Sequence, residues 1–198
     1  RSGPLDWLLH PGWAWDVGLK GGPHGFGNIA MYVKQSKNPR DYLHWTGTQF
    51  DASVTWKDIE WLRQVWKGNL VLKGVLDTDD ARQAVAVGAD GMIVSNHGGR
   101  QLDGVASTAT MLPRIADAVD SDTTLLVDGG IRSGQDLVRA LALGAKAALV
   151  GRPWVMALAA GGEAALSRYL ALVKQDMRTA LGLSGAINAR DVGREVLL

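Results

Sequence analysis

An internal repeat constrains the fold of this chain more than any other sequence feature. Aligned with itself, the chain places Lys73-Gly74-Val75 on Gly129-Gly130-Ile131, Gly88-Ala89 on Gly144-Ala145, and Ile93-Val94-Ser95 on Leu149-Val150-Gly151. Each copy has the pattern of a strand, a helix and a second strand. Two successive units of this design favour a (β/α) barrel over an open, doubly wound sheet.

Strands and helices are expected to alternate through the remainder of the chain. The apolar runs predict strands at Leu70–Lys73, Gly91–Val94, Thr124–Val127 and Ala147–Val150. The helical periodicities predict helices at Thr55–Trp66, Thr78–Val87, Ser107–Val119, Gly134–Leu143 and Gly161–Leu181. In the third helix, Pro113 suggests that the regular part begins near Leu112. Near-continuous apolar strands indicate a parallel α/β sheet covered on both faces. Four strands are half of the eight in a closed barrel, so we expect half a barrel.

Composition excludes several classes of protein. A chain of 198 residues that is 46% hydrophobic can bury one sizeable core. The net charge of +1 gives no argument for a nucleic-acid partner. The absence of cysteine excludes disulfides and thiolate metal sites, and it fits a cytosolic protein. The sequence shows neither a membrane-spanning run nor a signal peptide, and its opening residues resemble an interior segment.

Residues 1–53 differ in composition from everything after them. They combine four tryptophans with leucines, lysines and many turn-forming residues, without sustained periodicity. Tryptophan beside leucine and lysine suits the interface between water and lipid headgroups. The alternative is an irregular segment that packs against its own protein. We therefore divide the chain into an aromatic-rich segment at 1–53, a candidate membrane-contact region, and a half-barrel at 54–198.

Polar and glycine-rich clusters follow all four expected strands. In barrels of this type the ligand site lies at the carboxyl ends of the strands. That rule brings together Lys73, the stretch Ser95–Arg100, the stretch Asp128–Arg132, and Gly151-Arg152. Glycine amides, arginines and a helix amino terminus form a phosphate site in the last two clusters. The alternative is that these arginines are solvated cations beside helices.

Three side chains in these clusters suit chemistry on a small anion. His97 can act as a base and Arg100 can bind a carboxylate, although a polar turn with a solvated histidine would have the same composition. Lys73 ends a buried strand, where its ammonium needs an electron-rich partner such as a flavin ring. A Schiff-base lysine and a lysine that reaches solvent at the strand end are the alternatives for Lys73.

These motifs together resemble one known family. Lys73, Ser95–Asp103, Asp128–Arg132 and Gly151-Arg152-Pro153 resemble the FMN-dependent L-2-hydroxy acid dehydrogenase/oxidase family, and the similarity runs from about Trp13 to the last residue. Trp13–Gly18, Gly22-Pro23-His24 and Gly27-Asn28 most resemble its bacterial respiratory L-lactate dehydrogenase branch, with mandelate dehydrogenases next. The resemblance implies the C-terminal half of a TIM-type (β/α)8 barrel, strands five to eight with their helices.

The resemblance also implies roles for the matched residues. His97 would be the catalytic base, Arg100 would bind the substrate carboxylate, and Lys73 and Ser95 would contact the flavin ring and ribityl chain. Asp128 would bond the ribityl hydroxyls. The FMN phosphate would lie on Gly129, Gly130, Arg132, Gly151 and Arg152. No metal is implied.

The implied reaction is oxidation of an L-2-hydroxy acid to the 2-keto acid. L-lactate is the preferred substrate, mandelate is next, and electrons would pass to a membrane quinone. Alternatives are a peroxide-forming oxidase, or a non-catalytic half that needs a complementary chain. The family's first four strands, with the acid that orients the catalytic histidine, have no counterpart here, and whether Arg1 corresponds to the second substrate arginine stays open. We expect a homotetramer on the cytoplasmic face of the inner membrane.

Overall fold

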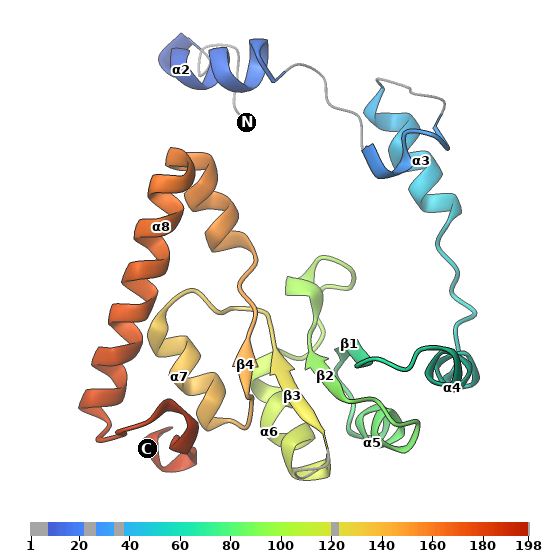
Figure 1. The fold of residues 1–198 in the computed structure, drawn as a ribbon, viewed down its shortest axis with the longest axis vertical. Coiled ribbons are helices and arrows are strands. Elements are labelled where there is room, and N and C mark those ends of the chain that lie inside the picture. The colour runs from blue at the N-terminus through green and yellow to red at the C-terminus, as the bar shows by residue number, and fades with distance from the viewer. Residues whose placement is uncertain (1–7, 22–26, 34–37, 120–122, 198) are drawn as a thin grey trace. The chain divides into compact units, whose positions relative to one another are not determined.

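The structure is a computed structural model that describes residues 8–21, 27–33, 38–119 and 123–197. The chain divides into two compact units, Arg1–Val54 and Thr55–Leu198 (Figure 1). Arg1 and the sequence Gly22-Pro23-His24 lie outside the described residues.

The first unit contains short helices joined by loops. Helix α2 (Pro11–Trp13) continues into a π-helix (Ala14–Leu19), a 3-10 turn follows at Gly27–Ile29, and helix α3 spans Pro39–Thr48. We expected no regular element in this segment, and α3 is a helix of ten residues. Its sequence signal is local, because the Asn38 side chain accepts the amide of Arg40 at 3.1 Å and Pro39 occupies the first turn.

Apolar side chains of the first unit are largely exposed. Leu8, Leu9 and Leu19 are each more than 70% exposed, and Trp13 and Trp15 are about half exposed. Tyr32 and Trp45 stack on each other with ring centroids 5.3 Å apart. Among the helices of the described residues, none has the length and apolar character that a membrane span requires. The predicted contact of this segment with a membrane surface stays a prediction.

The second unit is built on a four-stranded parallel sheet. Strands β1 (Val71–Val75), β2 (Gly91–Val94), β3 (Thr124–Val127) and β4 (Ala147–Ala148) pair in that order (Figure 1). The helices between and around them are α4 (Trp56–Val65), α5 (Thr78–Ala86), α6 (Thr108–Val119), α7 (Gly134–Ala142) and α8 (Arg152–Leu183). Three 3-10 turns lie at His97–Gly99, Ala189–Asp191 and Arg194–Leu197. The predicted parallel α/β half-barrel is confirmed.

The core lies between one face of this sheet and its helices. Met92 and Leu125 point to that face and pack in one cluster with Ala84 of α5 and Leu112 of α6. Successive strand residues face opposite sides, and Ile93, on the other side, is only partly buried. Among the described residues of this unit, the buried core lies on one face of the sheet, whereas the sequence predicted cover on both faces. A barrel wall has this asymmetry, because helices line its outside only.

A bulge in β1 turns Lys73 toward the less covered face. Lys73 pairs with Ile93 and Val75 pairs with Val94, with Gly74 between them at φ +99°. The extra residue places Lys73 and Val75 on opposite faces, although residues two apart in a regular strand share one. As a result Val75 is buried under the helices, while the Lys73 side chain stays 45% exposed.

Several predicted boundaries differ from the structure. Strand β1 ends at Val75 and not at Lys73, because the bulge at Gly74 continues its pairing with β2. Helix α6 is regular from Thr108, because the Ser107 hydroxyl accepts the amide of Thr110 at 3.2 Å, so Pro113 lies inside the helix. Strand β4 is shorter than expected. Helix α8 begins at Arg152, and the predicted start at Gly161 is a break where Gly161 and Gly162 leave helical geometry.

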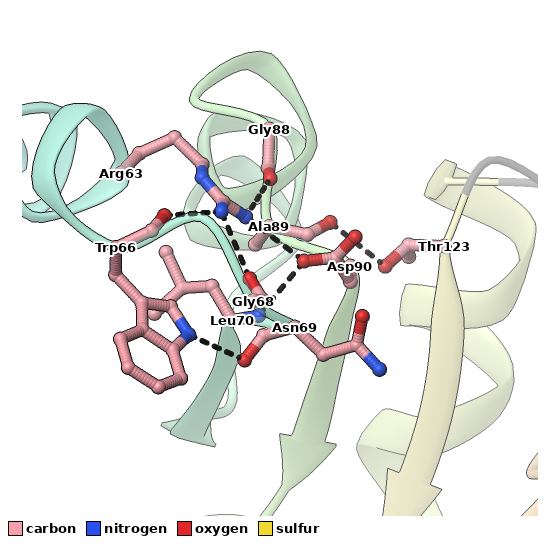
Figure 2. A network of polar contacts seen from close by, with 9 residues as sticks. All are labelled: Arg63, Trp66, Gly68, Asn69, Leu70, Gly88, Ala89, Asp90 and Thr123. Atoms are coloured by element: carbon pink, nitrogen blue, oxygen red, sulfur yellow. Dashed lines mark hydrogen bonds and ion pairs between the residues drawn. The ribbon is translucent and has the colours of Figure 1, made fainter.

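Polar contacts join the helices to the amino ends of β1 and β2. Figure 2 shows Arg63 of α4 between the carbonyls of Trp66, Gly68 and Gly88 and the carboxylate of Asp90. Arg63 Nη1 lies 2.9 Å from Asp90 Oδ2, and the same oxygen accepts the Leu70 amide at 2.7 Å. This network joins the ends of α4 and α5 to the amino ends of the first two strands. The candidate site lies at the opposite, carboxyl ends of the strands.

We expect Asp90→Asn to lower the free energy of unfolding at neutral pH. The variant should also lose the part of that free energy that disappears when wild type is acidified. The Leu70 amide, followed by Arg63, holds the pKa of Asp90 below its ordinary value. Its stabilisation is therefore complete above the unfolded-state pKa of about 4 and is lost as pH falls through the folded-state value. Urea unfolding from pH 7 to pH 3 measures this, with the exposed Glu163→Gln as control. A gap between wild type and Asp90→Asn that stays constant with pH would contradict it.

Candidate active site

Three predicted site residues from three strand ends meet at one point. Lys73 lies two residues before the carboxyl end of β1, and its Nζ donates to Ser95 Oγ after β2 at 2.7 Å. The same ammonium lies 2.5 Å from Asp128 Oδ2 after β3. Parallel strands bring their carboxyl ends to one edge, and the resulting cluster holds a cation, a hydroxyl and a carboxylate.

Asp128 has one carboxylate oxygen without a partner. Its side chain is only 17% exposed, and Oδ2 is ion-paired with Lys73. Oδ1 is buried and has no hydrogen-bond partner among the described residues. A buried carboxylate oxygen without a donor is costly, so this atom is suited to accept a hydroxyl or amide from a bound molecule.

The loop after β2 holds His97 in an uncommon conformation. His97 has φ +53°, in the left-handed region, and Gly98 and Gly99 follow at +64° and +71°. The amide of His97 donates to Ser95 Oγ at 3.1 Å, and the amide of Gly98 donates to Asn96 Oδ1 at 2.9 Å. A non-glycine residue in this region costs conformational energy unless its surroundings hold it there, and such residues cluster at functional sites. The exposed His97 is therefore held at a defined position by the buried Ser95.

Arg100 closes the same loop. Its amide donates to the His97 carbonyl at 3.3 Å, and its side chain is exposed. His97 and Arg100 thus belong to one short turn that lies next to the Lys73 cluster through Ser95. A base and a guanidinium on one turn can contact a single small carboxylic acid.

The glycine loop after β3 lies beside the His97 loop. Gly129 and Gly130 both have φ +87°, which glycine adopts readily. A Cβ on Gly129 would lie 3.0 Å from Asn96 Oδ1 and 3.1 Å from Thr108 Oγ1, whereas a Cβ on Gly130 would meet nothing within 4 Å. Gly129 is therefore packed against the His97 loop, and the backbone of Gly130 is open to a ligand.

Arg152 connects the end of β4 to the His97 loop. Its Nη2 lies 3.5 Å from the Gly98 carbonyl, and a Cβ on Gly98 would lie 3.0 Å from the same nitrogen. Gly151 precedes helix α8 and is open, since a Cβ there would also meet nothing within 4 Å. The fourth predicted cluster thus converges with the others. Arg132 is exposed, and its carbonyl accepts the Tyr169 hydroxyl at 3.2 Å.

Sequence reasoning gave no role to two residues that join these loops. Thr108, almost fully buried at the start of α6, donates from Oγ1 to the Gly129 carbonyl at 3.2 Å. Asn96 caps the His97 turn and approaches Gly129. The sequence Asn-His-Gly-Gly could have predicted the capping role of Asn96, because an asparagine side chain often hydrogen-bonds the backbone two residues on in such turns. Thr108 had no local signal, because its partner is distant in sequence.

No group of three histidine or carboxylate side chains among the described residues is placed to hold a metal ion.

The chain is similar to known flavin-dependent enzymes over almost its whole length. A family model described as FMN-dependent dehydrogenase matches residues 3–198. L-lactate dehydrogenase from Stenotrophomonas maltophilia (strain K279a) is 56% identical over 191 residues, covering 96% of this chain and 50% of the relative. L-lactate dehydrogenase from Yersinia pestis (strain Pestoides F) is 53% identical over 193 residues, covering 98% and 51%. The chain spans about half the length of these relatives.

The chain is also similar in structure to solved mandelate oxidases. The crystal structure of mandelate oxidase with 3,3-difluoro-2-hydroxy-3-phenylpropionic acid superposes with a TM-score of 0.69 at 48% identity. The match covers 73% of this chain and 44% of that one. A second mandelate oxidase structure, with benzoyl-formic acid, gives a TM-score of 0.66 at 47% identity, covering 71% and 44%.

Proposed function

Because the chain belongs to the FMN-dependent dehydrogenase family, we propose that it carries the flavin-binding and proton-accepting residues of an enzyme that oxidises L-2-hydroxy acids. The observation that carries this proposal is the convergence of the Lys73–Ser95–Asp128 cluster with the His97 turn and the glycine loop. L-lactate is our preferred substrate, because the L-lactate dehydrogenases compared are more than half identical to this chain.

The residues present fit FMN. Asp128 Oδ1 is a buried acceptor that finds no donor in the described part of the chain, and a ribityl hydroxyl could donate to it. The open backbone at Gly130 and Gly151, with Arg132 and Arg152 beside them, suits a phosphate. Lys73 would hold the flavin ring together with Ser95. FMN supplies a two-electron acceptor when it is bound.

His97 and Arg100 would act on the substrate. The Arg100 guanidinium would bind the carboxylate of the 2-hydroxy acid, and His97 would accept one of the two protons that leave as the alcohol becomes a ketone. Ser95 and the left-handed turn would hold His97 in place. The ion pair of Lys73 with Asp128 is unfavourable for the Schiff-base alternative, because a nucleophilic lysine must be an uncharged amine.

The electron acceptor is proposed to be a membrane quinone. Exposed Leu8, Leu9, Trp13 and Trp15 in the first unit support contact with a membrane surface, on the cytoplasmic face of the inner membrane. The second candidate function is a peroxide-forming oxidase, which the similarity to the mandelate oxidase structures favours.

One set of measurements tests the function. The purified protein should show a flavin absorbance band that L-lactate bleaches under nitrogen, more readily than mandelate does. Added quinone analogue should then restore the band faster than oxygen. Stoichiometric peroxide with no response to quinone would favour the oxidase. A protein that binds no flavin would contradict both candidates and leave the non-catalytic half, whose complementary chain mass spectrometry of the sample would detect.

A further inference from the structure

Helices α7 and α8 cross unusually closely beside the glycine loop. Gly134, the first residue of α7, is buried, and a Cβ there would lie 2.0 Å from the Met177 amide nitrogen and 2.3 Å from the Val173 carbonyl oxygen. The backbone of α8 therefore lies directly against the start of α7. This contact places α8 side chains within reach of the loop that precedes α7.

Two α8 residues bond to that region. The Tyr169 hydroxyl donates to the Arg132 carbonyl at 3.2 Å, at the end of the glycine loop. Asp176 Oδ2 accepts the Gln135 amide at 2.9 Å, in the first turn of α7. Tyr169 and Asp176 are two helical turns apart and so lie on one face of α8. Together they hold both sides of the loop's junction with α7.

Carboxylates already occupy the amino end of α7. The amides of Arg132 and Ser133 donate to Asp136 Oδ2 at 3.1 Å each, and Asp176 takes the Gln135 amide. A phosphate at this helix end would have to displace two negative side chains. The anion is thereby directed away from α7, toward the open backbone of Gly130 and Gly151.

We propose that Tyr169 and Asp176 are positioning residues, which hold the Gly129–Arg132 loop in the geometry that receives the phosphate of the cofactor. This inference rests on the proposed function, since it takes the bound phosphate to be that of FMN. The two residues act through the backbone of the loop and touch neither the flavin ring nor the substrate.

The surroundings of Tyr169 favour a lasting hydrogen bond. Partial burial, followed by the negative charge of Asp136, raises the pKa of Tyr169 above its usual value near 10. A phenol is already protonated at neutral pH, and the raised pKa extends to higher pH the range in which Tyr169 donates to the Arg132 carbonyl.

The test compares FMN with riboflavin, which lacks the phosphate. Tyr169→Phe retains the ring and loses the donor, so we expect the Kd for FMN to rise about three- to tenfold. Asp176→Ala leaves the Gln135 amide in the first turn of α7 without its acceptor and should raise the Kd for FMN about tenfold. Asp176→Asn retains an acceptor oxygen and should restore most of the affinity. The Kd for riboflavin should stay unchanged in every variant. Flavin fluorescence quenching measures both dissociation constants.

Controls separate this inference from simpler explanations. Gln175→Ala, an exposed change on the same helix, should leave both dissociation constants unchanged. Equal weakening of FMN and riboflavin, or a lower thermal unfolding midpoint with no change in FMN affinity, would show a general structural role and overturn the proposal. Failure of the wild-type protein to bind FMN would instead overturn the proposed function itself.

Discussion

Replacing His97 with glutamine is expected to reduce turnover of L-lactate by about two to four orders of magnitude, while the protein keeps its flavin and its yellow colour. Glutamine has no group that accepts a proton near neutral pH. FMN binding should persist, because the residues proposed to hold the cofactor are Lys73, Ser95, Asp128 and the glycine loop. Anaerobic bleaching of the flavin band by L-lactate measures the rate of the affected step.

The backbone at His97 calls for a second variant. A φ of +53° is strained for most residues, and asparagine tolerates it better than glutamine. If chemistry causes the loss, His97→Asn and His97→Gln should lose activity equally. His44→Gln, an exposed change in the first unit, should have no effect. Colourless protein in both His97 variants would mean that His97 is structural.

Replacing Gly134 with alanine is expected to lower the free energy of unfolding by about 3 kcal/mol and to weaken FMN binding. The added Cβ would lie 2.0 Å from the backbone nitrogen of Met177, and backbone cannot turn aside as a flexible side chain can. Helix α8 must therefore move away from α7, which separates Tyr169 from the glycine loop. Urea denaturation and FMN titration measure the two effects.

Gly182→Ala is the matched control. Gly182 also lies in a helix, but a Cβ there would meet nothing within 4 Å. Alanine should therefore be neutral or slightly stabilising by about 0.5–1 kcal/mol, which is its usual advantage over glycine in a helix. Unchanged stability of Gly134→Ala would mean that the close crossing of α7 and α8 does not hold in solution.

Much of the fold and most of the candidate site were predictable because their signals are local. An apolar run followed by Ser95–Arg100 identifies a strand and the loop at its carboxyl end, and the repeat adds parallel pairing. The start of α4 has a local signal too, since the amide and hydroxyl of Thr55 both donate to Asp58, three residues later, at 2.7 Å. The predicted start of α8 at Gly161 was wrong, because a pair of glycines is compatible both with the start of a helix and with a kink inside one.

Contacts between distant residues were not predictable. Nothing near Tyr169 in sequence indicates that it reaches Arg132, and nothing near Thr108 points to Gly129. The face of the sheet on which the Lys73 side chain lies also depends on strand pairing, because the bulge at Gly74 is a shift in the register of β1 against β2. Each of these features is a relation between two segments, and a local pattern describes one segment at a time.

By itself, the sequence determined the α/β class, the parallel order of the strands and the set of loops that share one edge, because periodicity and strand polarity are properties of local chain segments. Only the tertiary structure decided that Asp128 keeps one buried oxygen with no partner among the described residues, and that carboxylates occupy the start of α7. Hydrogen bonding inside a folded protein depends on which groups packing brings within about 3 Å, and that follows from the whole arrangement of the chain.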